Sequence, residues 1–194
     1  MLTYAAERLG IDRRQIASLL ILCFLGSYVD IPLAQLPSLA VQTTQVVSFF
    51  GRSYLVPVVE QRPAMILAVN VGGALIPACL AIYLIVKKQL YVEAAIGVLA
   101  VTILVHFLAV PVPGMGISVP VLLPPITAAI VAVLLSWKQS AAIAYISGTL
   151  GTLIGADLLN LGVLPALGGP VASIGGAGTF DGVFLTGILA MLLA

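Results

Sequence analysis

The chain has 194 residues, of which 61% are apolar and only 8% carry a charge, and its formal net charge is +1. Together with a mean hydropathy of +1.22, this composition excludes a soluble globule, since a 20.0 kDa chain cannot bury so much apolar surface. The near-neutral charge and the lack of a basic run argue against nucleic-acid binding. The sequence therefore predicts an integral membrane protein with a single polytopic domain over residues 1–194.

Six apolar segments are long enough to cross the bilayer, for which a helix needs about 20 residues. They run from about 15 to 36, 63 to 86, 90 to 110, 119 to 137, 140 to 163 and 173 to 194. Between the third and fourth segments, PVPGMGISVPVLLPP (111–125) holds five prolines and two glycines, which predict a tight or re-entrant turn. The expected fold class is an all-α membrane protein with about six transmembrane helices.

Basic residues are retained on the cytoplasmic side of a membrane, and here they place both termini in the cytoplasm. One side would carry Arg8, Arg13, Arg14, Lys87, Lys88 and Lys138. The other side would carry only Arg52 and Arg62. A signal peptide over residues 13–30 is the alternative for the first segment, but no small-x-small cleavage motif closes it before Asp30 and Pro32.

The outer connection at about 37–62 contains QVVSFFGRSYLVPVVE (45–60), in which two β-branched and aromatic runs flank Gly51 and Arg52. That pattern is typical of a short β-hairpin. Pro57 is expected at an edge position, because its nitrogen cannot donate to a ladder. The alternative is an amphipathic stretch that lies on the lipid headgroups.

Four ionisable side chains inside the apolar segments fall at similar depths. At about 1.5 Å per residue, Asp30, His106 and Asp157 lie about 24, 27 and 28 Å from the basic residues at the inner ends of their segments. Asp181 lies about 20 Å from the end of the chain. All four are thus expected in the outer half of the membrane.

Two amides join this layer: Asn70 about 10 Å below the outer surface, and Asn160 on the same helical face as Asp157. A carboxylate in mid-bilayer costs about 2.5–3.5 kcal/mol, so these groups are expected to face the bundle interior or a wet cavity. The candidate ion- or substrate-binding residues are therefore Asp30, Asn70, His106, Asp157, Asn160 and Asp181. For His106 alone, a hydrogen-bonded histidine near the interface is the alternative.

The stretch GGAG (175–178) is a poor helix former, and Thr179 is a plausible N-cap that places Asp181 in the first turn of the last helix. The positive end of the helix dipole would then stabilise the carboxylate. A helix broken inside the membrane is a common way for transporters to build a site. The alternative is a short terminal helix that begins near the interface, with Asp181 solvated.

Glycines at GxxxG spacing accompany both acids, Gly151 with Gly155 and Gly178 with Gly182. Such glycines allow close helix packing, which would hold the fifth and sixth segments together and bring Asp157 near Asp181. Packing alone also explains these glycines.

A close pair of carboxylates shares a proton and suits an aspartic hydrolase or a proton relay. With both ionised and His106 or Asp30 added, the pair would hold a cation. Carboxylate and amide oxygens favour magnesium or calcium, whereas a histidine ligand would favour zinc or manganese.

Other catalytic patterns are missing from the sequence, including a phosphate-binding glycine loop with its lysine, HExxH and GxSxG. Cys23 and Cys79 lie within predicted spans, where a cysteine is a small apolar packing group.

Four blocks, VVSFFGRSYLVPVVE, AVNVGGALIP, GADLLNL and SIGGAGTFDGVFLTGILA, resemble the prokaryotic multi-pass membrane family known only as domain of unknown function 1614. The resemblance covers about residues 31–194 and implies a polytopic membrane protein with no established activity. It also implies that Asn70, Asp157, Asn160 and Asp181 belong to a shared core.

A second resemblance is to the presenilin-like intramembrane aspartic proteases, through YVD (28–30), GAD (155–157) and PAL (165–167). The chain departs from that pattern, because Ile154 and Ala156 stand where both glycines of Gly-x-Gly-Asp belong. The family has a tyrosine directly before an aspartate, but here Val29 separates Tyr28 from Asp30. The family's PAL lies on a separate later helix, but here it follows Asp157 by only eight residues.

The favoured function is a small transporter or ion-binding protein in the cell membrane. No cofactor is predicted apart from a bound cation. A homo-oligomer is expected, since six short spans form only a small bundle. The alternatives are a structural membrane subunit, whose polar layer joins helices by hydrogen bonds, and an intramembrane aspartic protease with Asp157 and Asp181 as its catalytic pair.

Overall fold

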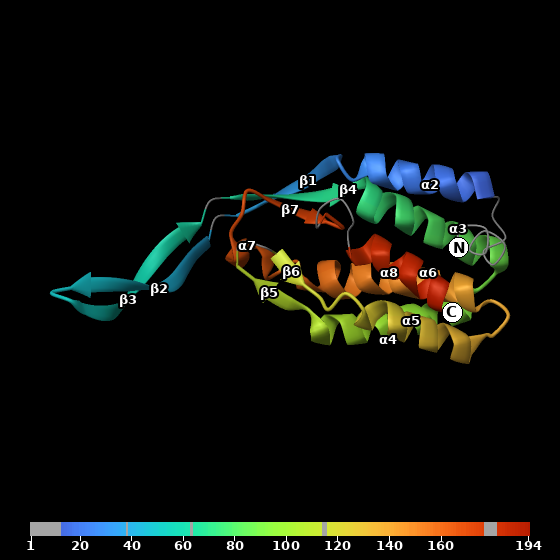
Figure 1. Ribbon diagram of the computed structural model, residues 1–194. Helices are drawn as coiled ribbons and strands as arrows, with labels where there is room; N and C mark the ends of the chain where they lie inside the picture. Colours follow the sequence, from blue (N-terminus) through green and yellow to red (C-terminus); the bar gives the residue numbers. More distant parts are fainter. Residues whose placement is uncertain (1–12, 38, 63, 114–115, 177–181) are drawn as a thin grey trace.

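The computed structural model of the chain describes residues 13–37, 39–62, 64–113, 116–176 and 182–194. A bundle of roughly parallel helices forms one end of the molecule, a small sheet lies beyond it, and a β-hairpin projects from the far end (Figure 1). The main helices are α2 (Arg13–Gly26), α3 (Ile76–Lys88), α4 (Tyr91–Leu108), α5 (Leu123–Leu135), α6 (Ser140–Thr152) and α8 (Gly182–Leu193).

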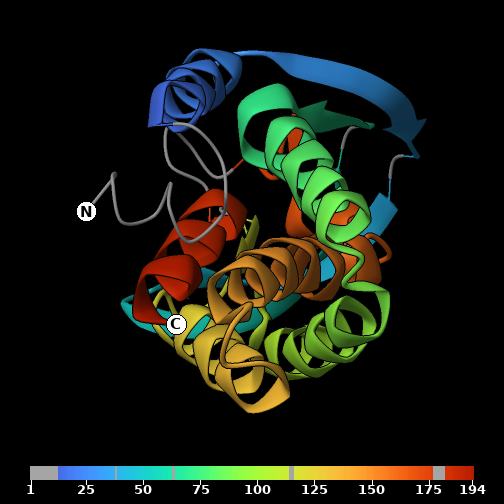
Figure 2. The same ribbon diagram turned by 90° about the vertical axis from the view of Figure 1, so that its right-hand side faces the viewer.

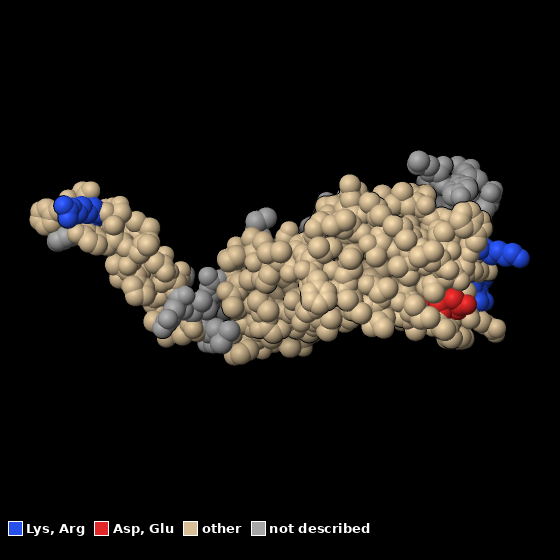
Figure 3. Space-filling view, turned by 90° about the horizontal axis from the view of Figure 1, so that it is seen from below, with Lys and Arg blue, Asp and Glu red and all other residues tan. Residues whose placement is uncertain are grey.

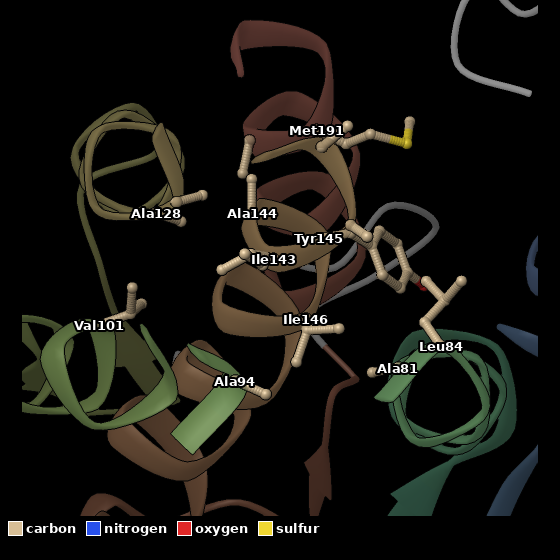
Figure 4. Packing of buried hydrophobic residues seen from close by; sticks show 14 of the residues in the cluster. Ala81, Leu84, Ala94, Val101, Ala128, Ile143, Ala144, Tyr145, Ile146 and Met191 are labelled. Carbon is tan, nitrogen blue, oxygen red and sulfur yellow. The ribbon is translucent and has the colours of Figure 1, made fainter. Parts of the chain in front are cut away.

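Helix α6 lies at the centre of the bundle, with α3, α4, α5 and α8 around it (Figure 2). Its first ten residues, 140–149, are all buried, as expected for a helix that is apolar on every side. Ile143 and Ile146 are fully buried, and Tyr145 points toward Leu84 of α3 (Figure 4). Burial of one such aliphatic side chain contributes about 1.5–3 kcal/mol.

The glycines of α6 bring its neighbours close, as the GxxxG pattern predicts, but the neighbour is α4 and not α8. A Cβ at Gly151 would lie 2.6 Å from the Cβ of Val101, and one at Gly155 would lie 2.7 Å from the backbone oxygen of Thr102. The contact with α8 uses Gly148 instead, whose added Cβ would meet the Thr186 backbone oxygen at 3.2 Å. The prediction that Gly151 and Gly155 join the fifth and sixth segments is therefore wrong.

A three-stranded sheet lies between the bundle and the hairpin, in the order β1 (Asp30–Leu36), β4 (Met65–Asn70), β7 (Val171–Ile174). β1 pairs antiparallel with β4, and β4 pairs parallel with β7. Each strand lies within or directly beside a segment predicted as a transmembrane helix, the first, second and sixth in turn. An all-α fold therefore holds for the bundle only.

Three helices in the described part of the chain are long and apolar enough to cross a membrane: Val71–Lys88, Tyr91–Leu108 and Ser140–Asn160. The other apolar helices are shorter, at Arg14–Gly26, Leu123–Leu135 and Gly182–Leu193. A helix of 12 residues such as α8 extends about 18 Å, well short of the hydrocarbon core of about 30 Å. Of the six expected spans, three thus contain a helix that is long and apolar enough to cross a membrane.

Apolar side chains cover the outer surface of the bundle. On α4, Val92, Ile96, Leu99 and Ile103 are exposed along one face, and Phe107 at its end is 82% exposed. One side of the molecule shows charge only at its two ends, with an uncharged surface between them (Figure 3). An apolar belt of this kind is suited to lipid rather than to water.

The predicted β-hairpin is confirmed. β2 (Leu39–Phe49) pairs with β3 (Arg52–Arg62) across a two-residue turn of Phe50 and Gly51, both with positive φ. That turn geometry matches the twist of the flanking strands.

The proline-rich turn also ends the third helix as predicted. A short ladder of β5 (Val110–Val112) and β6 (Gly116–Ser118) follows α4, and Pro124 and Pro125 stand in the first turn of α5. Proline is tolerated there, because the first helical nitrogens have no partner within the helix.

Candidate functional site

Asn70 joins the end of α2 to the start of the first membrane-length helix, Val71–Lys88. Its side-chain oxygen accepts from the Gly73 nitrogen at 2.8 Å, which caps the π-helical turn η1 (Val71–Leu75). Its side-chain nitrogen donates to the Ser27 backbone oxygen at 2.8 Å and to Asp30 Oδ1 at 3.0 Å. Asn70 is only 2% exposed, so each of these bonds replaces a lost bond to water.

Close backbone packing supports this junction. A Cβ on Gly72 would lie 1.9 Å from the Cys23 backbone oxygen and 2.3 Å from the Ser27 nitrogen. Only glycine therefore lets α2 lie directly against η1. The contact fixes the position of Asp30, which follows α2 by four residues and pairs with Asn70 across the β1–β4 ladder.

Both described candidate carboxylates bind the end of β7 or the turn that follows it. Asp30 accepts a short hydrogen bond from the Ser173 hydroxyl, and Asp157 Oδ2 accepts from the Gly175 nitrogen at 2.9 Å. Residues 173–176 form a turn, closed by a bond from the Gly176 nitrogen to the Ser173 oxygen at 3.1 Å. Gly175 has a φ of +68°, which a turn with a left-handed third residue requires. The turn thus lies between two acids that are 127 positions apart in the chain (157 − 30).

Asp30 and Asp157 also line one cavity of about 570 Å³, which lies between β7, the β5–β6 ladder and the start of α8. Its walls are mostly apolar, and Met65, Leu164 and Leu167 form a buried cluster at one part of them. Its polar groups include the two carboxylates, Ser173 and Thr152. A mainly apolar cavity with a few convergent polar groups is typical of a small-ligand site.

Thr152 is a site residue that the sequence does not reveal. It is 3% exposed, it lines the cavity, and its hydroxyl oxygen has no hydrogen-bond partner among the described residues. A buried hydroxyl without a partner costs about 1–3 kcal/mol. The hydroxyl oxygen is itself buried, so Thr152 borders the cavity without presenting this oxygen to it.

The π-helical segment η2 (Leu153–Asp157) explains how Thr152 and Asp157 reach one cavity. Residues five positions apart are about 140° apart around an α-helix, so they do not share a face. A π-turn bonds residue i to residue i+5 and brings such a pair onto one side. η2 is followed by the 3-10 turn η3 (Leu158–Asn160), so α6 ends as its residues pass the cavity.

The other predicted site residues are placed apart from the cavity or lie outside the described residues. Asn160 is buried and donates to the Gly155 and Ala156 backbone oxygens at 3.0 and 2.9 Å, so it ends its own helix and does not line the cavity. His106 is exposed on the last turn of α4, beside Phe107, and does not line the cavity either. Asp181, together with Gly178 and the proposed N-cap Thr179, lies outside the described residues.

The described residues include no group of three or more His, Cys, Asp or Glu side chains placed to hold a metal ion. Of the expected polar layer, the structure therefore brings together Asp30 with Asn70 by a hydrogen bond, and Asp30 with Asp157 around a cavity.

This fold and site define an apolar protein with three membrane-length helices and a small sheet. An acidic cavity lies beside β7 of that sheet. A family model described as "Protein of unknown function (DUF1614)" matches residues 24–193. The chain belongs to this family, as its four sequence blocks predict. No curated protein and no solved structure matches the chain, so the likeness to presenilin-like proteases gains no support.

Proposed function

We propose that this chain is a multi-pass membrane protein that binds a cation, or a small cationic solute, in the cavity beside β7 as one step of transport. The observation that carries the proposal is the convergence of the Asp30 and Asp157 carboxylates on one cavity. Two carboxylates that line one cleft concentrate positive charge there, although Asp30 itself is exposed.

The proposed arrangement in the cell membrane has six passes and both termini in the cytoplasm. Three passes are full-length helices, and α2, α5 and α8 supply the others together with strand or loop segments. Non-helical backbone is tolerated at membrane depth where it lines a cavity, as β7 does here. The Ser140 hydroxyl binds the Ala194 backbone oxygen at 2.9 Å, so the chain end lies near Lys138 on the proposed cytoplasmic side.

A homo-oligomer is part of the proposal. Helix α2 leaves Leu22 and Leu25 more than half exposed, and a second copy would cover part of this apolar face. Light scattering of the protein in detergent, corrected for the bound detergent, gives the number of chains per particle. A monomer at all protein concentrations would remove this part of the proposal.

The test of cation binding is thermal unfolding in detergent across a panel of inorganic and organic cations. The variants are Asp157→Asn, which keeps an acceptor for Gly175, and Asp30→Asn. Glu93→Gln is the matched control, because Glu93 lies in the first turn of α4 and does not line the cavity. Stabilisation of the protein by any cation of the panel, inorganic or organic, supports the proposed binding site.

At a hundredfold excess over its dissociation constant, a ligand stabilises the folded state by about 2.7 kcal/mol. For a chain of this length that corresponds to a rise of about 5–10 °C in unfolding temperature. We expect the rise in the wild type and in Glu93→Gln, and its loss in Asp157→Asn. A panel in which no cation separates the wild type from Asp157→Asn would reject a binding site and leave the carboxylates a structural role.

A further inference from the structure

The shape and lining of the cavity indicate the chemical class of the cation that it binds. This inference rests on the proposed function above. We propose that the ligand is an amphipathic organic ammonium ion, with its charged head between Asp30 and Asp157 and its hydrocarbon body along β7. A bare metal ion is the competing occupant. An organic ammonium ion and a metal ion require cavities of different size, different numbers of coordinating protein atoms and walls of different polarity.

The size of the cavity favours an organic ligand. A volume of about 570 Å³ lies within the range of about 300–1,000 Å³ found for small-molecule sites. A calcium site instead gathers six to eight oxygens at about 2.3–2.6 Å from one point. No cluster of three or more acidic, His or Cys side chains suited to a metal exists among the described residues.

Polar and apolar groups are also separated along the cavity. Residue Asn70 of β4 pairs with Asp30, whereas Met65 at the other end of β4 pairs with Leu36. Asn70 follows Met65 by five positions in the strand, which corresponds to about 17 Å. The acidic end of the cavity therefore lies near Ser173 and Gly175, and the apolar end near Met65 and Val171.

The apolar end would take the hydrocarbon part of a ligand. Met65, Leu164 and Leu167 are each at most 9% exposed and form one buried cluster that lines the cavity. At the acidic end, an ammonium group has up to three donors for the two carboxylates. A ligand with a charged head and an apolar body therefore matches both ends at once.

The test is a binding titration of the full chain in detergent with n-alkylammonium ions from ethyl to hexyl, followed by thermal shift. Alkyl alcohols of the same lengths are the controls, because they enter detergent micelles but carry no charge. Chlorides of sodium, potassium, magnesium and calcium are titrated in parallel. The protein variants are Asp157→Asn, Leu167→Asn at the apolar end, and Leu193→Asn, an exposed position outside the cavity.

We expect the apparent affinity to rise about threefold to fourfold with each added methylene, and the alcohols to have no such effect. Asp157→Asn should weaken every member of the series, while Leu167→Asn should flatten the dependence on chain length. Leu193→Asn should resemble the wild type.

Saturable stabilisation by a metal chloride, without a response to the ammonium series, would overturn this inference and leave the proposed function standing. No response to either class would overturn both.

Discussion

The substitution Gly72→Ala tests whether close packing of α2 on η1 positions the acidic site. The added Cβ would lie 1.9 Å from the Cys23 backbone oxygen, against an ordinary contact distance of at least 3.4 Å. The two backbones would have to separate by about 1.5 Å, the difference between these distances, and neither is a flexible side chain. Overpacking of a well-packed interior costs about 1–3 kcal/mol, and two rigid backbone contacts place this site at the upper end.

The separation also has a local consequence. Asn70 bridges the same junction at 2.8 Å to Ser27 and 3.0 Å to Asp30, and a shift of 1.5 Å would break both bonds. We therefore expect Gly72→Ala to lose about 3 kcal/mol of unfolding free energy, measured by urea-induced loss of helical signal in mild detergent. It should also lose the cation response of the site.

Gly162→Ala is the matched control, because a Cβ there meets no atom within 4 Å. It should change the unfolding free energy by less than about 0.5 kcal/mol. Equal stability of the two variants would refute the close approach of α2 to η1, and with it the account of how Asp30 is held in place.

Three further substitutions test other parts of the structure. Asn70→Ala removes three hydrogen bonds at a buried position, and denaturant unfolding should show a loss of about 2–4 kcal/mol; a change below 1 kcal/mol would contradict the junction described here. Thr152→Val keeps the side-chain shape and removes an unpartnered buried hydroxyl, so thermal unfolding should show no loss of stability and a gain of up to about 1 kcal/mol. A destabilised Thr152→Val protein would indicate a structural hydroxyl instead. Replacing residues 40–61 by an Asn-Gly turn should change the unfolding free energy by less than about 1 kcal/mol, because the hairpin projects away from the bundle; a larger loss would show that it supports the core.

Local signals in the sequence predicted the features that depend on neighbouring residues. The hairpin followed from Gly51 between two β-branched runs, and the break after the third helix followed from prolines. The cost of polar groups in an apolar segment predicted that they face inward; Asn70 and Asn160 are buried, whereas Asp30 and His106 are exposed. In each case the deciding residues lie within a few positions of one another.

Long-range pairing explains what the sequence did not reveal. Asp30 binds Asn70 and Ser173, which are 40 and 143 positions away. Hydropathy alone does not separate an apolar strand from an apolar helix. The predicted spans therefore contain β1 and β4 and overlap the end of β7. α-Helical periodicity places Thr152 and Asp157 on different faces, so the sequence does not reveal that both line the cavity. The π-helical segment η2, which ends at Asp157, brings them to one side.

The central claim is that Asp30 and Asp157 make the cavity a water-accessible site that favours cations. Its most direct test is the modification rate of Ser173→Cys, in a background without Cys23 and Cys79, by cationic and anionic methanethiosulfonate reagents of similar size. The ratio of the two rates, normalised to free cysteine, should exceed one and should fall on the order of tenfold when Asp157→Asn is added, since one charge in the cavity is removed. A thiol that neither reagent reaches, or a ratio that Asp157→Asn leaves unchanged, would contradict the account.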